Sequence, residues 1–346
     1  MKLLLRLFLV LCPLLFFSTC LDNIDLDIPP TEPSLVISGT IYNAPGPYYV
    51  TLTESAAFVS GPLGIPDRVT GATVKILDDL GTIEILTEIE PGKYSTSING
   101  IRGQVGQTYW VEVAVNEKNY ESRPEKMPQI ISAESLEIEL SSEEQFNQAG
   151  NLRTVNFVNV LVNTRFPNTQ QASFLRWNIS GVYQFPDRNS FNPRTCYITE
   201  NLNFDNVSVV ASTNVATDFL QKEEILATEV DFRFAFRYCF KVAQQTITSE
   251  AYNFWSGVAE EKERSGNILE TTPGRIQGNV FNPQDNEEEV LGFFAAAAVD
   301  TIELLVLSEE VGHPRQKCIQ IAQFLESCTN CLSVSNSSLV KPTCFD

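Results

Sequence analysis

The segment Val230-Asp-Phe-Arg-Phe-Ala-Phe-Arg-Tyr-Cys-Phe-Lys-Val242 places a large apolar residue at every second position. Successive side chains of a β-strand point to opposite faces, so this alternation predicts one long strand with one apolar face. Burying its seven large side chains would contribute on the order of 10–15 kcal/mol of gross transfer free energy, at roughly 2 kcal/mol each. We therefore expect this strand at the centre of a hydrophobic core, with Arg233 and Arg237 on its outward face.

Residues 34–128 show a similar pattern in shorter pieces. Tyr109, Val111, Val113 and Val115 share one face of a segment whose other face carries Glu112. Turn residues such as Asp78-Asp-Leu-Gly81 separate these segments at the spacing of a strand sandwich. About seven strands with no helical stretch predict an immunoglobulin-like or fibronectin-type β-sandwich domain.

After a proline-containing linker at Pro124–Pro128, residues 129–346 predict a larger β-rich domain with one inserted helix. That helix is expected from Ser249 to about Arg264, because apolar residues recur there at helical spacing and Ser249 can cap its first turn. Its buried stripe should consist of Ala251, Phe254, Trp255 and Val258. The expected fold is mainly β, with two β-sandwich domains in tandem and a cysteine-rich tail.

The start of the chain predicts export and lipid attachment. Lys2 and Arg6 accompany an apolar run of about fifteen residues, shorter than the roughly 20 that span a bilayer. Phe17-Ser-Thr-Cys20 follows, and small residues before a cysteine are typical of lipoprotein signal peptides. We expect residues 1–19 to be removed, Cys20 to carry the lipid and the acidic, proline-rich residues 20–33 to form a tether. The alternative is an ordinary signal peptide that happens to contain a cysteine.

The mature chain would be strongly acidic. Without Lys2 and Arg6 it has 22 basic and 43 acidic residues, a net charge of −21. Such a charge disfavours nucleic-acid binding and adsorption to anionic membranes. Attachment to a membrane would then depend on the lipid.

Six cysteines remain after signal removal and lipidation: Cys196, Cys239, Cys318, Cys328, Cys331 and Cys344. An even number in an exported chain predicts disulfides, and six cysteines allow 15 connectivities that the sequence does not separate. The alternative is a four-thiolate zinc site made by Cys318, Cys328, Cys331 and Cys344, which the Cys328-Thr-Asn-Cys331 spacing would suit.

The sequence predicts no catalytic residues, no metal and no cofactor. His313 is the only histidine, and its loop-like setting favours a surface residue over a catalytic base. Carboxylate pairs such as Asp78-Asp79 fall in predicted turns, whereas glycosidases need two carboxylates at a defined separation across a cleft. No phosphate-binding loop is present, because Gly274-Arg-Ile-Gln-Gly278 lacks the lysine that follows such a loop.

Several short motifs resemble those of a family of predicted outer-membrane lipoproteins from Bacteroidota-type bacteria, the domain-of-unknown-function family four-two-four-nine. The motifs cover nearly the whole mature chain: Pro33-Ser-Leu-Val-Ile-Ser-Gly39, Gly46-Pro-Tyr-Tyr-Val-Thr-Leu-Thr53, Gly71-Ala-Thr-Val-Lys-Ile76, Pro91-Gly-Lys-Tyr94, Gly106-Gln-Thr-Tyr109, Glu250-Ala-Tyr-Asn-Phe-Trp255, Gln277-Gly-Asn-Val280, Val290-Leu-Gly-Phe-Phe294 and Cys328-Thr-Asn-Cys331. The C-terminus departs from the family pattern, since Pro342-Thr-Cys-Phe345 adds Cys344 and lacks a tryptophan. The resemblance implies a gene beside a TonB-dependent receptor and carries over no catalytic residues.

These observations favour a non-enzymatic outer-membrane lipoprotein, an accessory or binding subunit of a TonB-dependent uptake system, with the receptor as its expected partner. The alternatives are a surface glycan hydrolase or peptidase, and a structural envelope protein. An enzyme should show a pocket with converging carboxylates of shifted pKa. A binding subunit should show an apolar or aromatic surface without such a site. Whether the protein faces the periplasm or the cell surface stays open.

Overall fold

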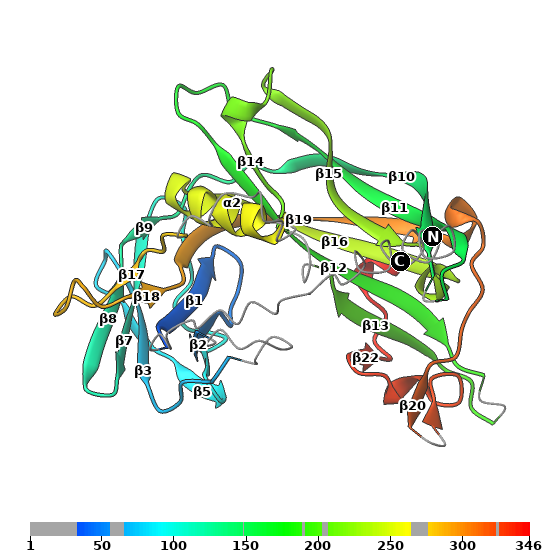
Figure 1. Cartoon of the computed structure of the whole chain (residues 1–346), viewed down its shortest axis with the longest axis horizontal. Coiled ribbons are helices and arrows are strands. Elements are labelled where there is room, and N and C mark those ends of the chain that lie inside the picture. The colour runs from blue at the N-terminus through cyan, green and yellow to red at the C-terminus, as the bar shows by residue number, and fades with distance from the viewer. Residues whose placement is uncertain are drawn as a thin grey trace, which may run out of the picture. The chain divides into compact units, whose positions relative to one another are not determined.

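The computed structural model describes residues 33–55, 66–147, 149–188, 191–202, 207–263, 276–322 and 325–346. The expected signal peptide, Cys20 and nearly all of the expected tether lie outside these residues. The described part is mainly β, as the sequence predicts, and contains one α-helix (Figure 1). None of its helices is long and apolar enough to cross a membrane.

The largest sheet of the described residues has eleven strands, which come from all three thirds of the chain. Its main path runs in the order β22 (Ser337–Ser338), β13 (Thr195–Asn201), β12 (Phe174–Pro186), β16 (Arg237–Ile247), β19 (Phe294–Leu307), β1 (Leu35–Tyr42), β2 (Tyr49–Glu54), β6 (Lys93–Ser95) and β5 (Thr87–Glu90). Two short strands, β14 (Val209–Ala211) and β18 (Val290–Leu291), pair with β12 and β1. β1 and β19 are parallel, with Gly39 opposite Phe294.

Three smaller sheets complete the described strands. One contains β17 (Val280–Phe281), β8 (Lys118–Ser122), β7 (Thr108–Val115), β3 (Thr73–Asp78) and β4 (Ile83–Ile85), with β9 (Glu125–Lys126) paired to β7. A second contains β10 (Ala133–Phe146), β11 (Leu152–Arg165) and β15 (Phe219–Glu229). The third joins β20 (Gln320–Ala322) to β21 (Leu325–Glu326).

Strand β19 contributes to both main hydrophobic cores. Phe294, Ala296 and Ala298 lie in a core with the apolar faces of β1, β2, β3 and β7. Further along the same face, Val306 lies in a second core with β11, β12, β15 and β16. The small side chains of the Ala295–Ala298 run allow neighbouring elements to approach closely. The core formed by residues 34–128 therefore also includes residues between 280 and 298. The expected arrangement of two tandem sandwiches remains a prediction.

The local periodicity of β7 gives a correct prediction. Tyr109, Val111, Val113 and Val115 are all buried, as their alternation indicates. The predicted single strand over Val230–Val242 is wrong in its first half, because Phe232–Phe234 form a 3-10 turn and β16 begins only at Arg237. The carboxylate of Asp231 accepts the backbone N–H of Arg233 at 2.9 Å, and this local bond favours a turn over an extended chain.

Helix α2 (Ser249–Glu263) confirms the predicted helix, and the described part of it ends one residue before the expected end. Its cap differs from the expectation: the hydroxyl of Thr248, not of Ser249, accepts the backbone N–H of Ala251 at 3.1 Å. Ala251, Phe254 and Trp255 pack with Ala295 and Ala297 of β19. These alanines are on the face of the large sheet opposite to the two main cores, so α2 covers that outer face.

All six predicted cysteines form disulfides, and the zinc alternative is wrong because each sulfur is bonded to another cysteine. The pairs are Cys196–Cys331, Cys239–Cys344 and Cys318–Cys328. Two of them attach the tail to strands of the large sheet, at β13 and β16. Phe345, which is buried, packs against Tyr197 with ring centroids 5.2 Å apart, so the tail also covers part of the outer face.

Candidate functional site

A pocket of about 610 Å³ lies on the outer face of the large sheet, beside α2. Its walls are aromatic and come from β1, β2, α2 and the loops next to them: Tyr42, Tyr48, Tyr49, Phe254, Trp255 and Phe293. Because Ile37 and Ile41 of β1 point into the first core, Ser38, Thr40 and Tyr42 point outward into this space. Arg176 of β12 is the one charged residue among the described residues that line it.

The predicted apolar stripe of α2 forms one wall of the pocket. Ala251 is buried, but Phe254, Trp255 and Val258 are only half-buried and line the pocket. Phe254 packs against Phe293 with ring centroids 5.1 Å apart, and Phe254 and Trp255 meet edge to face. The stripe is therefore divided between packing on the sheet and an exposed aromatic wall.

Arg176 lies in this pocket without an acidic partner among the described residues. Its guanidinium stands 3.8 Å from the centre of the Trp255 ring. Nη1 donates to Oε1 of Gln245 at 3.2 Å, and Nε2 of Gln245 donates to the hydroxyl of Tyr42 at 3.2 Å. Nε of Arg176 is buried and has no hydrogen-bond partner there. Burial lowers the pKa of Arg176, with Tyr42 opposing the shift, and an arginine still stays charged.

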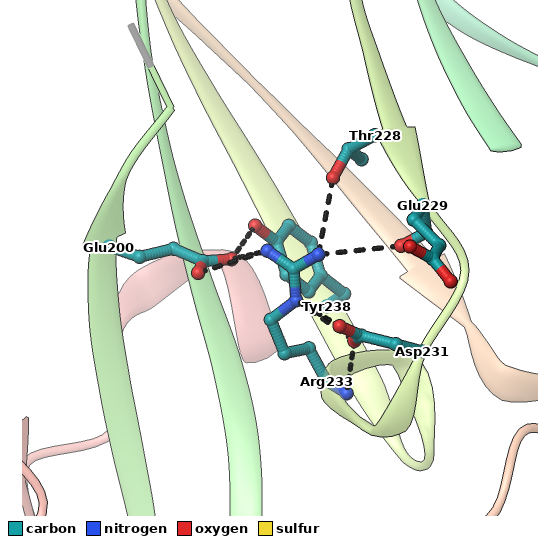
Figure 2. Close-up of polar contacts among 6 residues, drawn as sticks. All are labelled: Glu200, Thr228, Glu229, Asp231, Arg233 and Tyr238. Atoms are coloured by element: carbon teal, nitrogen blue, oxygen red, sulfur yellow. Dashed lines mark hydrogen bonds and ion pairs between the residues drawn. The ribbon is translucent and has the colours of Figure 1, made fainter. Parts of the chain in front are cut away.

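Arg233 shows how the same chain satisfies a similarly enclosed arginine (Figure 2). Nε donates to the carboxylate of Asp231 at 2.9 Å, and Nη1 donates to Glu200 at 3.0 Å. Nη2 donates to the Thr228 hydroxyl and to the Glu229 carbonyl oxygen at 3.3 and 3.4 Å. Arg233 was expected on an outward face and is instead only 17% exposed, because the 3-10 turn directs it toward these acceptors.

The Arg233 cluster, which also includes Tyr238, is a structural connection between sheets. Glu200 belongs to β13 of the large sheet, whereas Thr228 and Glu229 belong to β15 of the three-stranded sheet. Burial lowers the pKa of Arg233, but the Asp231 hydrogen bond and the charges of Glu200 and Asp231 outweigh it, so the pKa is raised. Burial, and then the charge of Glu200, raise the pKa of Tyr238, which donates to Glu200. Both carboxylates are occupied by the guanidinium, which leaves no free acid–base pair.

A second pocket, of about 490 Å³, contains a carboxyl group with an altered pKa. Glu125 of β9 and Glu250 of α2 both line it. Burial, and secondarily the charge of Glu250, raise the pKa of Glu125 to about 7, although hydrogen bonds from Thr248 and Asn279 oppose the shift. Glu125 is 4% exposed, and the capping hydroxyl of Thr248 donates to its Oε2 at 2.6 Å. A carboxyl group of this kind can hold a proton near neutral pH.

Glu125 should make folding stability depend on pH. Its folded-state pKa of about 7 lies above the ordinary 4.5, so the folded protein binds this proton more tightly than the unfolded chain. Its contribution to stability is complete below about pH 4.5 and is lost as the pH rises through 7. We expect Glu125→Gln to match the wild type at pH 4.5 and to be more stable by about 1–3 kcal/mol at pH 8.

Urea unfolding at pH 4.5, 6 and 8 measures this difference. Glu250→Gln is the matched control, because it removes the neighbouring charge and leaves the buried carboxyl in place, so its gain at pH 8 should be smaller. A difference between Glu125→Gln and the wild type that stays constant across this range would contradict the raised pKa.

The other residues considered from the sequence lie apart from these pockets. His313 is exposed in a loop, as expected, and Cys20 is outside the described residues. Among the described residues, one group could place three ligand atoms within 4.8 Å of one another: Cys239, Glu303 and Cys344. Its two sulfurs are bonded to each other, which removes them as thiolate ligands.

Arg176, Gln245 and Glu125 were not recognised from the sequence. Alternation along β12 places Leu175 and Trp177 in the second core and therefore Arg176 on the other face. That signal was available in the sequence. No signal in the sequence indicated the position of α2 over this face, because that position depends on how strands far apart in the chain pair with one another.

Comparison with protein families places these residues in a wider context. A family described as Domain of unknown function (DUF4249) matches residues 22–303, which is most of the chain. The chain belongs to the DUF4249 family. The DUF4249 match includes Arg176, Glu125 and every aromatic residue of the first pocket, and it ends before Cys318. A comparison with curated proteins finds no match.

Proposed function

We propose that this DUF4249 protein is a non-enzymatic lipoprotein of the outer membrane that acts as an accessory or binding subunit of a TonB-dependent uptake system. The observation that carries the proposal is the aromatic pocket around Arg176. The walls of this pocket are apolar. Arg176 is the one charged residue among the described residues that line it, and Arg176 has no acidic partner there. None of the described lining residues carries a carboxylate that could act on a substrate. Such a pocket suits binding better than acid–base chemistry.

The sequence supports the setting of this function. The segment ending in Phe17-Ser-Thr-Cys20 indicates lipidation at Cys20, and the motifs shared with receptor-linked lipoproteins indicate a β-barrel receptor as partner. We further infer two β-sandwich-like domains in tandem, the second carrying α2 and the disulfide-bonded tail, with β19 contributing to the cores of both.

One observation favours the alternative of a surface hydrolase. Glu125 and Glu250 line the same pocket, and the raised pKa of Glu125 would suit a general acid. The carboxyl of Glu125 is nearly enclosed and hydrogen-bonded to the helix-capping residue Thr248, which favours a structural role.

Affinity purification of tagged protein from native membranes in mild detergent tests the proposal, beside a hydrolase screen on glycans and peptides. We expect a β-barrel receptor to copurify and the screen to show no turnover. The same screen on Glu125→Gln separates the alternatives. Turnover that disappears in this variant, with no copurifying barrel, would replace the binding function by the enzymatic one.

Lipid attachment is tested by Cys20→Ala. Because the lipid would be the only means of holding this acidic chain at a membrane, we expect the variant to be unprocessed or released into the soluble fraction. Fractionation and metabolic labelling with a fatty-acid analogue measure this, with Cys12→Ala as the control that should change neither result. Unchanged membrane retention and labelling of Cys20→Ala would exclude the lipoprotein assignment.

A further inference from the structure

The chain places an uncompensated positive charge in an apolar pocket. A partly buried guanidinium without a counter-charge is energetically unfavourable, because water is displaced and no acceptor replaces it. Arg233 avoids this penalty through four acceptors around its three nitrogens. Arg176 has one hydrogen bond, to Gln245, and a ring contact with Trp255 within the described part of the chain. Its environment therefore lacks a negatively charged acceptor among the described residues.

The missing acceptor is not explained by a shortage of acidic residues. The chain carries 43 Asp and Glu against 24 Lys and Arg, yet no described carboxylate lines this pocket. Other arginines of the chain, such as Arg153 and Arg165, are paired with glutamates even on the exposed surface. The positive charge at Arg176 is thus left available to something outside the described chain.

We propose that this pocket binds a small molecule that joins a carboxylate to a flat apolar body. The carboxylate would accept hydrogen bonds from the guanidinium of Arg176, and the hydroxyl of Tyr42 is the second donor. The hydroxyl of Tyr42 already accepts from Gln245, so its own hydrogen is available. Trp255, Phe254 and Tyr49 would contact the apolar body.

The size and the rigidity of the pocket agree with this ligand class. A volume of about 610 Å³ lies within the range of roughly 300–1,000 Å³ that is typical of small-molecule sites. Gln245 is buried and forms hydrogen bonds with both proposed ligand donors, the guanidinium of Arg176 and the hydroxyl of Tyr42. These two donors are therefore held in place before a ligand binds.

The proposal rests on the proposed binding function and specifies its ligand. Two sources could supply the same chemistry: a free aromatic acid, or the terminal carboxylate of a peptide. 2-Naphthoate represents the first, and N-acetylphenylalanine represents a peptide end. Their neutral amides, 2-naphthamide and N-acetylphenylalanine amide, keep the apolar bodies and remove the charge.

Isothermal titration of the purified soluble chain (residues 21–346) at 0.15 M salt tests the proposal with these four probes. We expect at least one acid to bind about tenfold or more tightly than its amide, because hydrogen bonds to charged groups are worth about 1.5–3 kcal/mol. The acid that shows the larger preference identifies the source of the carboxylate.

Arg176→Gln should remove the preference of the acid over the amide, because it weakens acid binding about tenfold or more beyond any change in amide binding. Arg153→Gln is the matched control, because it removes the same charge from an exposed position and should keep the preference. If Arg176→Gln does not fold, Tyr42→Phe decides, since loss of one hydroxyl donor should lower the preference of the acid over the amide about two- to tenfold.

Absence of binding by all four probes, equal binding of acids and amides, or an equal loss in Arg153→Gln would overturn the proposal. None of these results would affect copurification with a barrel receptor. A failed receptor experiment would likewise leave the measured ligand preference intact, so the two failures are distinguishable.

Discussion

Replacing Arg233 with methionine is expected to lower the free energy of unfolding by about 2–4 kcal/mol, because the substitution leaves Glu200 and Asp231 partly buried without their cation. Removing one partner of a fully buried ion pair costs about 3–5 kcal/mol, and partial exposure of this cluster reduces that value. Urea unfolding at pH 7 measures the change.

Arg165→Met provides the matched control for this prediction. Arg165 also lies between two carboxylates, with Nε 3.0 Å from Glu134 and Nη1 3.4 Å from Asp218, but its side chain is 53% exposed. Exposed ion pairs contribute about 0–1 kcal/mol, so the control should change stability little. If both variants lost the same free energy of unfolding, burial between the two sheets would give the Arg233 cluster no stability beyond that of an exposed ion pair.

Three disulfides involve the tail, and removing Cys196–Cys331 should lower the free energy of unfolding more than removing either of the other two. This bond closes a loop of 135 residues, and both sulfurs are buried at the edge of the second core. We expect the double variant Cys196→Ala/Cys331→Ala to lose about 2–5 kcal/mol of unfolding free energy, because the cross-link restricts the unfolded chain.

The Cys318–Cys328 bridge serves as the control for that measurement, because it closes a loop of only 10 residues. Loop-closure entropy predicts that Cys318→Ala/Cys328→Ala loses about 2 kcal/mol less than the first double variant. Denaturant unfolding under oxidising conditions measures both. A loss from the short bridge that equals or exceeds the loss from the long one would contradict the dependence on loop length.

The parts of the fold that follow from local periodicity could be predicted from the sequence. The buried face of Tyr109–Val115 and the helix from Ser249 each depend on residues close together in the chain. The segment Val230–Val242 shows the limit of this reasoning. Its alternation continues through Phe232–Phe234, yet the local hydrogen bond from Arg233 to Asp231 produces a turn there.

The candidate site could not be predicted in the same way. Arg176 and Gln245 are 69 residues apart, and Gln245 and Tyr42 are 203 residues apart. Their meeting depends on the strand order β12, β16, β19 and β1, in which a parallel pairing joins β19 to β1. Periodicity indicates which face a side chain is on, but it does not tell which distant strand lies beside it. The disulfide connectivity is undetermined from the sequence for the same reason.

The position of β19 has a consequence for the order of events during synthesis of the chain. β1 obtains its parallel neighbours only from residues 290–297, so the first third of the chain is synthesised before those neighbours exist. Until then, the edge of β1 and the apolar residues that Phe294 covers stay open to wrong pairing. Contacts between such distant segments form slowly. A chaperone that shields an exposed strand edge would therefore matter most for this early segment, and least once the residues up to 307 have been synthesised.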